Sequence, residues 1–488
     1  MEKPESTGLV RVGFYNLALK LAIAPLSFAF SLLVVKYLSN PPYGLEVFGT
    51  WQYIFTLVIG YFTIPADMFS LITSRYSSEG RPVGGLLVIN GISGLVSSLT
   101  FLILIPYFVY ASHFDYPFYF YLSISLILIY YLYRISNAMV MGRTPKKVGE
   151  IAAVFQVVRL SSAIIMMFIF NLSIAAVILA YDFGYLVQIL LNLLYIKSNL
   201  KLDFNLASVA IRKSLPVTVY YLQNVIEASL VWVVVSITGN TITVSYFESA
   251  FVLANVITWS QATQTGLIKK LSETKDPSVI ETSLKLFSLT SSLFMFIIFA
   301  EGKDILFKLR PDYVNSIFAL YVISFSNLIR GIYSIFYQSI LMKDETLSIE
   351  GQGELKGELA KLTRINLLLS IIGVIISILL IEFLKSYPYF IIAVFMSMGL
   401  LINSFSMLFT SYRSSRRLYN FKVPREFFIP VLLSFLGIPF SFLIGGKSYL
   451  DILVYGVISI GIFSALNLIN PYFRQLGRNV IGFIKSMK

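Results

Sequence analysis

The sequence has no cysteine and only one histidine. Without cysteine, disulfide-stapled folds, thiolate metal sites and cysteine nucleophiles are excluded. Charge is also scarce, because Asp, Glu, Lys and Arg make up 13% of the 488 residues, whereas a soluble domain usually carries about 25%. This fraction of charged residues is too low for the surface of a soluble protein. We therefore expect most of the chain to be surrounded by lipid.

Long apolar runs take the place of the missing charge, and 57% of the residues are hydrophobic. A backbone that crosses a bilayer must satisfy its polar groups within the segment, so apolar runs of roughly 20 residues are expected to be helices. The first run exceeds the ~7 to 15 residues of a signal-peptide core, and we expect it to be retained. The runs predict an all-α polytopic membrane protein with about fourteen transmembrane helices: Val12 to Leu38, Val47 to Ile72, Val83 to Ala111, Pro117 to Met141, Val148 to Phe170, Leu172 to Ile196, Ser214 to Ile237, Ile242 to Ile268, Val279 to Phe299, Tyr313 to Met342, Leu362 to Phe383, Tyr387 to Ser411, Phe427 to Ile444 and Tyr449 to Leu468.

Basic residues lie mainly in alternate loops. Cytoplasmic loops of membrane proteins collect Lys and Arg, and most of the 38 such residues fall in inner segments when the N-terminus is placed inside. The outer segments contain only Lys36, Lys303, Lys308, Arg310, Lys385 and Lys447. This asymmetry predicts a multi-pass protein of the cell (plasma) membrane with both termini in the cytoplasm. It also accounts for the net charge of +13 without a nucleic-acid partner.

The loops between the predicted helices are short. The longest inner loop, Glu345 to Glu358, is acidic and interrupted by glycine, which indicates a solvated linker. On the outer side we expect an exposed loop from Glu301 to Asp312. A membrane glycosyltransferase or polymerase would keep an acidic catalytic site on a sizeable outer loop, so we predict that the protein is not an enzyme and has no catalytic residues, cofactor or metal site.

The two halves of the chain resemble each other at an offset of 196 residues, which is the separation of Arg134 from Arg330. The first four predicted helices then align with the seventh to the tenth, which indicates a duplication. An even number of helices per half predicts two six-helix bundles in parallel repeat, at residues 1–198 and 214–412. A cytoplasmic linker, 199–213, joins them, and residues 413–488 form two additional transmembrane helices and a cytoplasmic tail.

Ionisable residues inside the predicted helices are the candidate functional residues, because each costs about 2.5 to 3.5 kcal/mol at the bilayer centre. The cations are Lys20, Arg134, Arg159 and Arg330, and the acids are Asp67, Asp182, Glu227 and Glu248. The cations suit the phosphate or diphosphate of a lipid-linked sugar, since a guanidinium binds phosphate oxygens in pairs. The acids suit a coupling H⁺ or Na⁺. The structural alternative is that the two sets neutralise each other as pairs between helices.

Two further local patterns bear on this choice. Glu227 lies in the middle of its predicted helix, near the polar residues Gln223 and Asn224, and is the best candidate for an ion site, although structural pairing with a cation is favoured over coupling. Pro25 and Pro65 remove backbone hydrogen bonds, so we expect the first two helices to bend.

Several short motifs resemble those of the polysaccharide-transporter, or O-antigen (lipid-linked oligosaccharide) flippase, branch of the multidrug/oligosaccharidyl-lipid/polysaccharide exporter superfamily. They are Tyr43-Gly44, Phe48-Gly49-Thr50-Trp51, Ser74-Arg75-Tyr76, Tyr133-Arg134, Met141-Gly142-Arg143, Leu215-Pro216 and Val244-Ser245-Tyr246-Phe247-Glu248-Ser249-Ala250. Two positions depart from the pattern: Ile268-Lys269-Lys270 replaces a common proline, and Trp232-Val233-Val234 replaces a common Asp.

The resemblance implies a protein that flips a polyprenyl- or dolichyl-(di)phosphate-linked oligosaccharide from the inner to the outer leaflet, by alternating access through a central cavity with interior basic residues. Its partners would be that substrate, membrane lipids, possible coupling H⁺ or Na⁺, and the enzymes that assemble the glycan. The alternative is an ion-coupled multidrug and toxin extrusion antiporter, although four interior bases are unfavourable for a cavity that receives cationic drugs.

Overall fold

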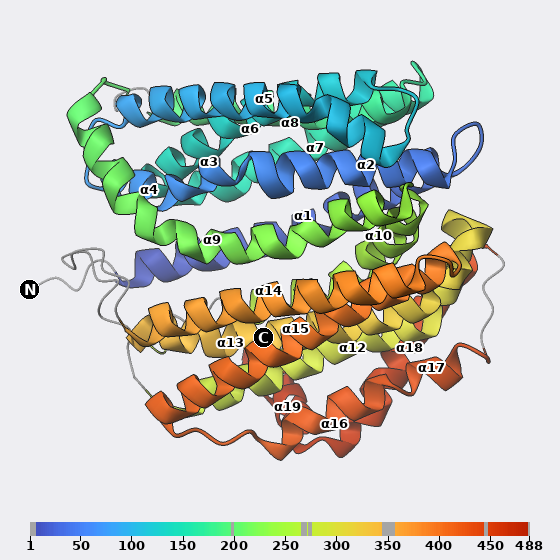
Figure 1. Cartoon of the computed structure of the whole chain (residues 1–488). Helices are drawn as coiled ribbons and strands as arrows, with labels where there is room; N and C mark the ends of the chain where they lie inside the picture. Colours follow the sequence, from blue (N-terminus) through green and yellow to red (C-terminus); the bar gives the residue numbers. More distant parts are fainter. Residues whose placement is uncertain are drawn as a thin grey trace, which may run out of the picture. The chain divides into compact units, whose positions relative to one another are not determined.

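A computed structural model describes residues 6–196, 200–264, 271, 276–343, 357–443 and 448–486, with side chains described from residue 22 onward except at 71, 211–221, 224, 342–343 and 479–486. These residues form helices and no strand (Figure 1). Eleven helices are long and apolar enough to cross a membrane, and a bent pair brings the number to twelve. The prediction of an all-α polytopic membrane protein is confirmed.

Each predicted span overlaps helical structure in the described residues. The first eight correspond to α1 (Ser6–Ser39), the broken span α2 (Leu45–Leu57), η1 (Val58–Phe62), α3 (Ile64–Met68) and α4 (Ser70–Ser78), then α5 (Gly84–Ser112), α6 (Phe118–Arg143), α7 (Pro145–Phe168), α8 (Ser173–Ile196), α9 (Phe204–Thr238), and α10 (Ile242–Ala254) with η3 (Asn255–Gln264). The others correspond to α12 (Ser278–Leu309), η4 (Pro311–Ser316) with α13 (Ile317–Lys343), α14 (Glu358–Leu384), α15 (Tyr389–Tyr419), α16 (Arg425–Ser434) with α17 (Gly437–Phe440), and α18 (Tyr449–Leu466).

The helices divide into two compact units. Unit 1 comprises Met1–Ser245, Gln352–Leu355 and Ser370–Tyr389, and unit 2 comprises Tyr246–Gly351, Lys356–Leu369 and Phe390–Lys488. Helix α9 therefore groups with the helices before it, and α14 contributes to both units. The predicted duplication into bundles 1–198 and 214–412 stays a prediction. The two units are defined by which residues lie close together, and this does not test whether the two halves are similar.

In unit 1, α8 packs along α6 and α7, while α6 also lies against α4 and α5. A buried core with Tyr76 of α4, Leu86 of α5, Met139 of α6, Ile151 of α7 and Ile196 of α8 joins these helices. The approach of α4 to α6 requires Gly142, because a Cβ at this position would lie 1.9 Å from the carbonyl oxygen of Ser74. The motifs Ser74-Arg75-Tyr76 and Met141-Gly142-Arg143 thus meet at a close backbone contact.

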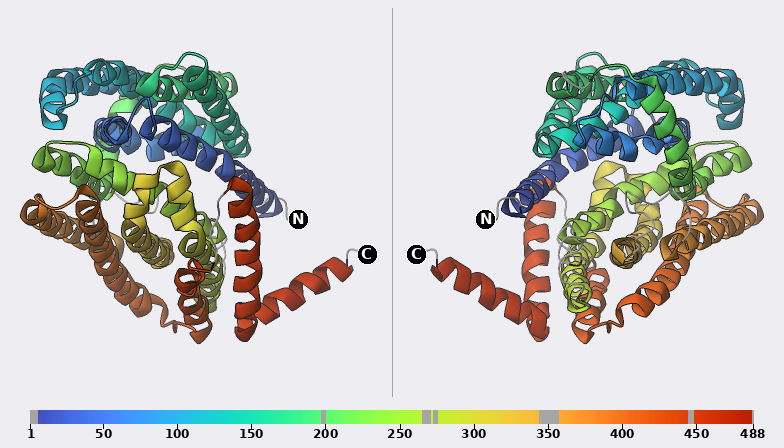
Figure 2. Two further views of the ribbon diagram at one scale, coloured as in Figure 1. Left: turned by 90° about the vertical axis from the view of Figure 1, so that its right-hand side faces the viewer. Right: turned by 90° about the vertical axis from the view of Figure 1, so that its left-hand side faces the viewer.

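In unit 2, α12 is the central helix and packs against α13, α16, α17, α18 and η3. Phe296 of α12 and Phe463 of α18 are buried together, with their ring centroids 5.5 Å apart. Figure 2 shows α19 (Pro471–Ser486) as the last red helix, which runs at an angle to α18 toward the C-terminus. The predicted cytoplasmic tail therefore contains a helix.

Two sequence-based expectations are wrong in detail. Glu301 does not begin an exposed outer loop, because α12 continues to Leu309 and only 1% of Glu301 is exposed. The apolar residues Ile305, Leu306 and Phe307 keep this stretch helical, and Ser459 of α18 donates a hydrogen bond to Glu301 Oε1 at 3.2 Å. The thirteenth span is also not one helix: α16 ends at Ser434 and α17 begins at Gly437.

Candidate functional site

The second span of unit 1 is broken in the middle. After α2 the chain forms a π-helical segment, Val58–Phe62, and Thr63 separates it from α3. The two parts of the span, Leu45–Phe62 and Ile64–Ser78, meet at 42°. Pro65 has no backbone N–H and so cannot bond to a carbonyl in the preceding turn. The bend predicted for this helix is confirmed.

Neighbouring side chains satisfy the carbonyl groups that the break releases. The Phe62 carbonyl oxygen accepts hydrogen bonds from the Tyr131 hydroxyl at 2.9 Å and the Ser97 hydroxyl at 2.8 Å. The Ile59 carbonyl accepts one from the Thr63 hydroxyl at 2.9 Å. Irregular backbone within a bilayer is tolerated where protein groups replace the lost hydrogen bonds. The break is therefore stabilised by hydrogen bonds from side chains of α5 and α6.

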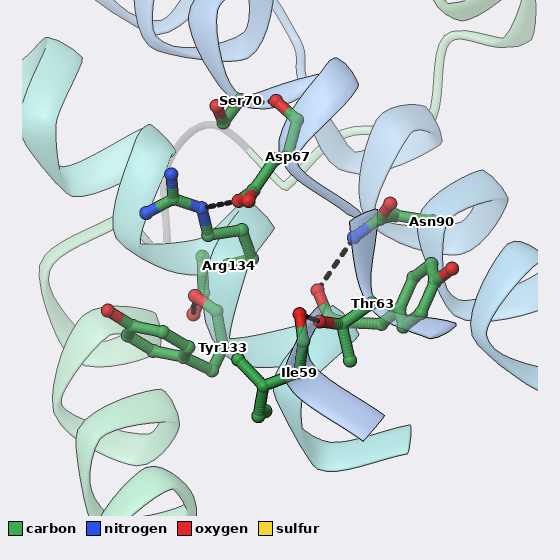
Figure 3. A network of polar contacts seen from close by, with 9 residues as sticks. Ile59, Thr63, Asp67, Ser70, Asn90, Tyr133 and Arg134 are labelled. Atoms are coloured by element: carbon green, nitrogen blue, oxygen red, sulfur yellow. Dashed lines mark hydrogen bonds and ion pairs between the residues drawn. The ribbon is translucent and has the colours of Figure 1, made fainter. Parts of the chain in front are cut away.

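The break carries Asp67, and Asp67 pairs with Arg134 of α6 (Figure 3). The bond runs from Arg134 Nε to Asp67 Oδ1, and the two side chains are 31% and 22% exposed, respectively. The Ser70 hydroxyl donates a hydrogen bond to the backbone carbonyl oxygen of Asp67 at 2.8 Å. Nearby, the Asn90 side-chain amide donates one to the backbone carbonyl oxygen of Tyr131 at 2.6 Å. The two predicted site residues thus neutralise each other, which agrees with the structural alternative for this pair. A phosphate contact by Arg134 stays a prediction.

Arg159 of α7 has a different environment. It is only 5% exposed, and its guanidinium carbon lies 4.0 Å from the ring centroid of Phe30 on α1 and 4.8 Å from that of Tyr181 on α8. Its Nη2 donates to Gln156 at 2.5 Å and Ser27 at 3.3 Å, while its Nε is buried without an acceptor. No carboxylate among the described residues forms an ion pair with this cation.

A column of stacked rings connects the surroundings of the two arginines. Tyr133 of α6 stacks on Tyr185 of α8 with centroids 4.5 Å apart, and Tyr185 stacks on Phe155 of α7 at 4.7 Å. Phe155 in turn lies 5.1 Å from the Arg159 guanidinium carbon. Gly184 permits this approach of α7 to α8, because a Cβ there would lie 2.8 Å from the Phe155 ring.

Asp182 of α8 is a buried acid. It follows Tyr181 directly on α8, yet it points to α6 and not to Arg159. Ser125 donates to its Oδ2 at 2.6 Å, whereas its Oδ1 has no partner, and the residue is 4% exposed. A carboxyl group in this position requires either a proton or a small cation to balance its charge.

Two other predicted residues of unit 1 are less informative. Glu227 accepts a hydrogen bond from Gln223 at 3.2 Å and one from Ser370 of α14 at 3.4 Å. Lys20 lies on α1, and its side chain is outside the described residues, as is that of Asn224.

In unit 2, Arg330 of α13 donates from Nε to the Ser404 hydroxyl of α15 at 3.0 Å. The 196-residue offset places Thr263, and not an acid, at the position equivalent to Asp67. Glu248 of α10 is half-buried and makes no hydrogen bond or ion pair with any described residue. The predicted equivalence of Arg134 and Arg330 stays a prediction.

Sequence reasoning identified the charged residues but not what surrounds them. The capping hydroxyls of Ser97 and Tyr131, the Ser125 hydroxyl on Asp182 and the rings around Arg159 all come from other helices.

No protein-family model matches the sequence, and no curated protein matches it significantly. Solved structures do match. A structure of the lipid II flippase MurJ, in an inward closed conformation, aligns over 93% of this chain and 99% of its own with 14% identity and a TM-score of 0.65. A multidrug resistance MATE family transporter of the MOP superfamily aligns in its inward-facing form over 82% and 98%, and in its outward-facing form over 86% and 99%. Both alignments have 12% identity and a TM-score of 0.59. The chain therefore has the fold of these membrane transporters.

Proposed function

We propose that the protein moves a polyprenyl- or dolichyl-(di)phosphate-linked oligosaccharide from the inner to the outer leaflet of the cell membrane by alternating access. The fold supports transport in general, since it is shared by a lipid II flippase and by multidrug transporters. The observation that carries the choice of an anionic substrate is Arg159. The cytoplasmic position of both termini, and contact with glycan-assembling enzymes, belong to the same proposal.

A buried guanidinium without a carboxylate is costly, because the charge has left water without a compensating partner. Aromatic rings cover the faces of Arg159, and cation–π contacts recover only part of the hydration energy. The N–H groups of the Arg159 guanidinium point outward in its plane, and among them Nε has no acceptor. Phosphate oxygens fit this edge, since they accept paired hydrogen bonds from arginine.

The paired arginine has a second role in this proposal. Arg134 is partly exposed and already bonded to Asp67, so a diphosphate that reaches it exchanges one anionic partner for another. Substrate binding would then release Asp67 from Arg134. Because Asp67 lies on α3 within the broken span, this release would change the contacts of the break. Arg330 and Lys20 are proposed as further contacts of the head group.

The test is transport by the purified protein in vesicles, with a lipid-diphosphate oligosaccharide as substrate. Arg159→Gln removes the charge and shortens the side chain but keeps a polar amide, and we expect outward transport to fall about tenfold or more, since charged hydrogen bonds contribute roughly 1.5 to 3 kcal/mol. The control is Arg474→Gln, at an exposed position of α19, which should transport normally. Full transport by a folded Arg159→Gln protein would contradict the proposal.

Asp182 favours a second candidate, the ion-coupled antiporter. A buried carboxyl with one free oxygen suits reversible binding of H⁺ or Na⁺. In that case an imposed cation gradient would drive export of a cationic drug, and Asp182→Asn would abolish it. Drug export that depends on the gradient and on Asp182, without transport of the lipid-linked saccharide, would favour this candidate over the flippase.

A further inference from the structure

Unit 2 contains an apolar cavity of about 310 Å³ between four of its helices. The lining residues come from α12, α13, α15, α16 and the segment before α16, and they are Leu284, Ile332, Phe336, Phe405, Leu408, Phe409, Tyr412, Val423, Phe427 and Phe428. Tyr412 supplies the only side-chain polar atom. The volume is at the lower end of the roughly 300 to 1,000 Å³ of small-molecule sites.

The cavity opens to the surroundings of the protein. Phe405, Phe409 and Phe428 line it, yet they are 46%, 66% and 50% exposed. Phe405 and Phe409 belong to α15, which is long and apolar enough to cross a membrane, so the medium that reaches them is the bilayer. An apolar groove on such a surface is filled by hydrocarbon and not by water.

One end of the cavity is basic. Three exposed residues, Arg416, Lys422 and Arg425, form what we term the basic rim. Arg416 donates to the hydroxyl of the lining residue Tyr412 at 3.2 Å and lies over its ring. Lys422 directly precedes the lining residue Val423, and Arg425 opens α16 two residues before Phe427.

The acids beside the rim do not neutralise it. Glu426 pairs with Lys285 at 3.7 Å, and Glu281 accepts the backbone N–H of Lys422 at 3.0 Å. Within the described parts of the chain, no carboxylate forms an ion pair with Arg416, Lys422 or Arg425. The groove therefore combines an apolar channel with uncompensated positive charge at one end.

We propose that this groove binds an anionic phospholipid of the bilayer, with an acyl chain in the cavity and the phosphate group on the basic rim. The charge pattern selects this occupant, because a zwitterionic lipid gains little from three cations and a free anion gains nothing from the apolar lining. The basic end of the helices is the end that the distribution of Lys and Arg assigns to the cytoplasm, so the lipid comes from the inner leaflet. The bound lipid is distinct from the transported substrate and does not depend on its identity.

The bound chain has a structural consequence for α16. This helix has only ten residues and is followed by the break before α17. It is held to α12 by the hydrogen bond from Ser288 to the Phe427 carbonyl, at 2.5 Å. A hydrocarbon chain between α15 and α16 fills space that the short helix leaves open, so phospholipid should raise the stability of unit 2.

Native mass spectrometry tests the proposal on the full chain, after exchange into mixed micelles that contain phosphatidylglycerol or phosphatidylethanolamine. We expect one phosphatidylglycerol to be retained, in excess over phosphatidylethanolamine by an amount on the order of fivefold. The triple variant Arg416→Gln, Lys422→Gln, Arg425→Gln should lose this preference, and Leu408→Trp, which fills the cavity, should lose the retained lipid. Inorganic phosphate should not compete.

The controls separate this site from general binding. Leu368→Trp on α14 introduces the same indole at a side chain that is 59% exposed and does not line the cavity, and Arg474→Gln removes a basic residue outside the rim; both should retain the lipid. The three rim residues are exposed, so their replacement leaves the fold intact. Equal retention of the two phospholipids by the unaltered protein, or undiminished retention of phosphatidylglycerol by the rim variant, would overturn the proposal.

Discussion

Arg134 of α6 and Asp67 of α3 are 67 residues apart in the sequence and are bonded to each other in the structure. The carboxylate sits on a short helix that follows a break, while the guanidinium comes from an unbroken neighbouring helix. This contact ties the broken second span to α6. It also balances two charges that would each be unfavourable in the membrane alone.

Removal of one partner should therefore destabilise the protein. Asp67→Asn leaves Arg134 without its anion, and because both groups are partly exposed we expect a loss of about 1 to 3 kcal/mol, less than for a fully buried pair. Thermal unfolding in detergent measures this loss. The reversed pair, Asp67→Arg with Arg134→Asp, should recover stability but not transport. Recovery of both would show that Arg134 has no direct role toward the substrate.

The hydroxyl groups of Tyr131 and Ser97 both donate to the Phe62 carbonyl, so their contributions to stability should not be independent. Tyr131→Phe or Ser97→Ala alone leaves one donor on the Phe62 carbonyl, so each should cost less than about 1 kcal/mol. The double variant leaves this carbonyl unsatisfied in the membrane, and the loss should exceed the sum of the single losses. Strict additivity in a double-mutant cycle would show that the two hydroxyls are not alternative caps.

The orientation in the membrane can be tested by labelling, and the absence of native cysteine makes the background clean. Lys303 of α12 and Lys422 before α16 are both exposed. We expect cysteines at these positions to react with a membrane-impermeant reagent from opposite sides, with position 422 accessible from the cytoplasm. Labelling of both from one side would show the predicted topology to be wrong.

Membrane potential should assist the proposed flippase. Outward movement of a diphosphate gains about 2.3 kcal/mol per charge for each 100 mV of inside-negative potential. We expect vesicles to equilibrate the substrate without an imposed H⁺ or Na⁺ gradient, and to do so faster outward when the interior is negative. A strict requirement for a cation gradient would instead indicate coupling.

Variants of the two acids then identify where an ion would bind. Under the flippase proposal Glu227→Gln should transport almost normally, because its carboxylate is held by Gln223 and Ser370. Asp182→Asn should also transport almost normally, since its amide oxygen can still accept the hydrogen bond from Ser125. Loss of gradient dependence in Asp182→Asn with Glu227→Gln unchanged would assign the coupling ion to Asp182.

The sequence by itself determined where the helices are. Each span in lipid must satisfy its own backbone, so an apolar run is converted to a helix by local constraints alone, and Pro65 marked the bend for the same local reason. Even the errors were local: Glu301 was assigned to a loop because its charge ended an apolar run. The tertiary structure alone decided which charges meet. Asp67 reaches Arg134, whereas Arg159 is enclosed by aromatic rings and Asp182 turns to Ser125, because partners depend on how neighbouring helices rotate and approach, and that information is distributed over residues far apart in the chain.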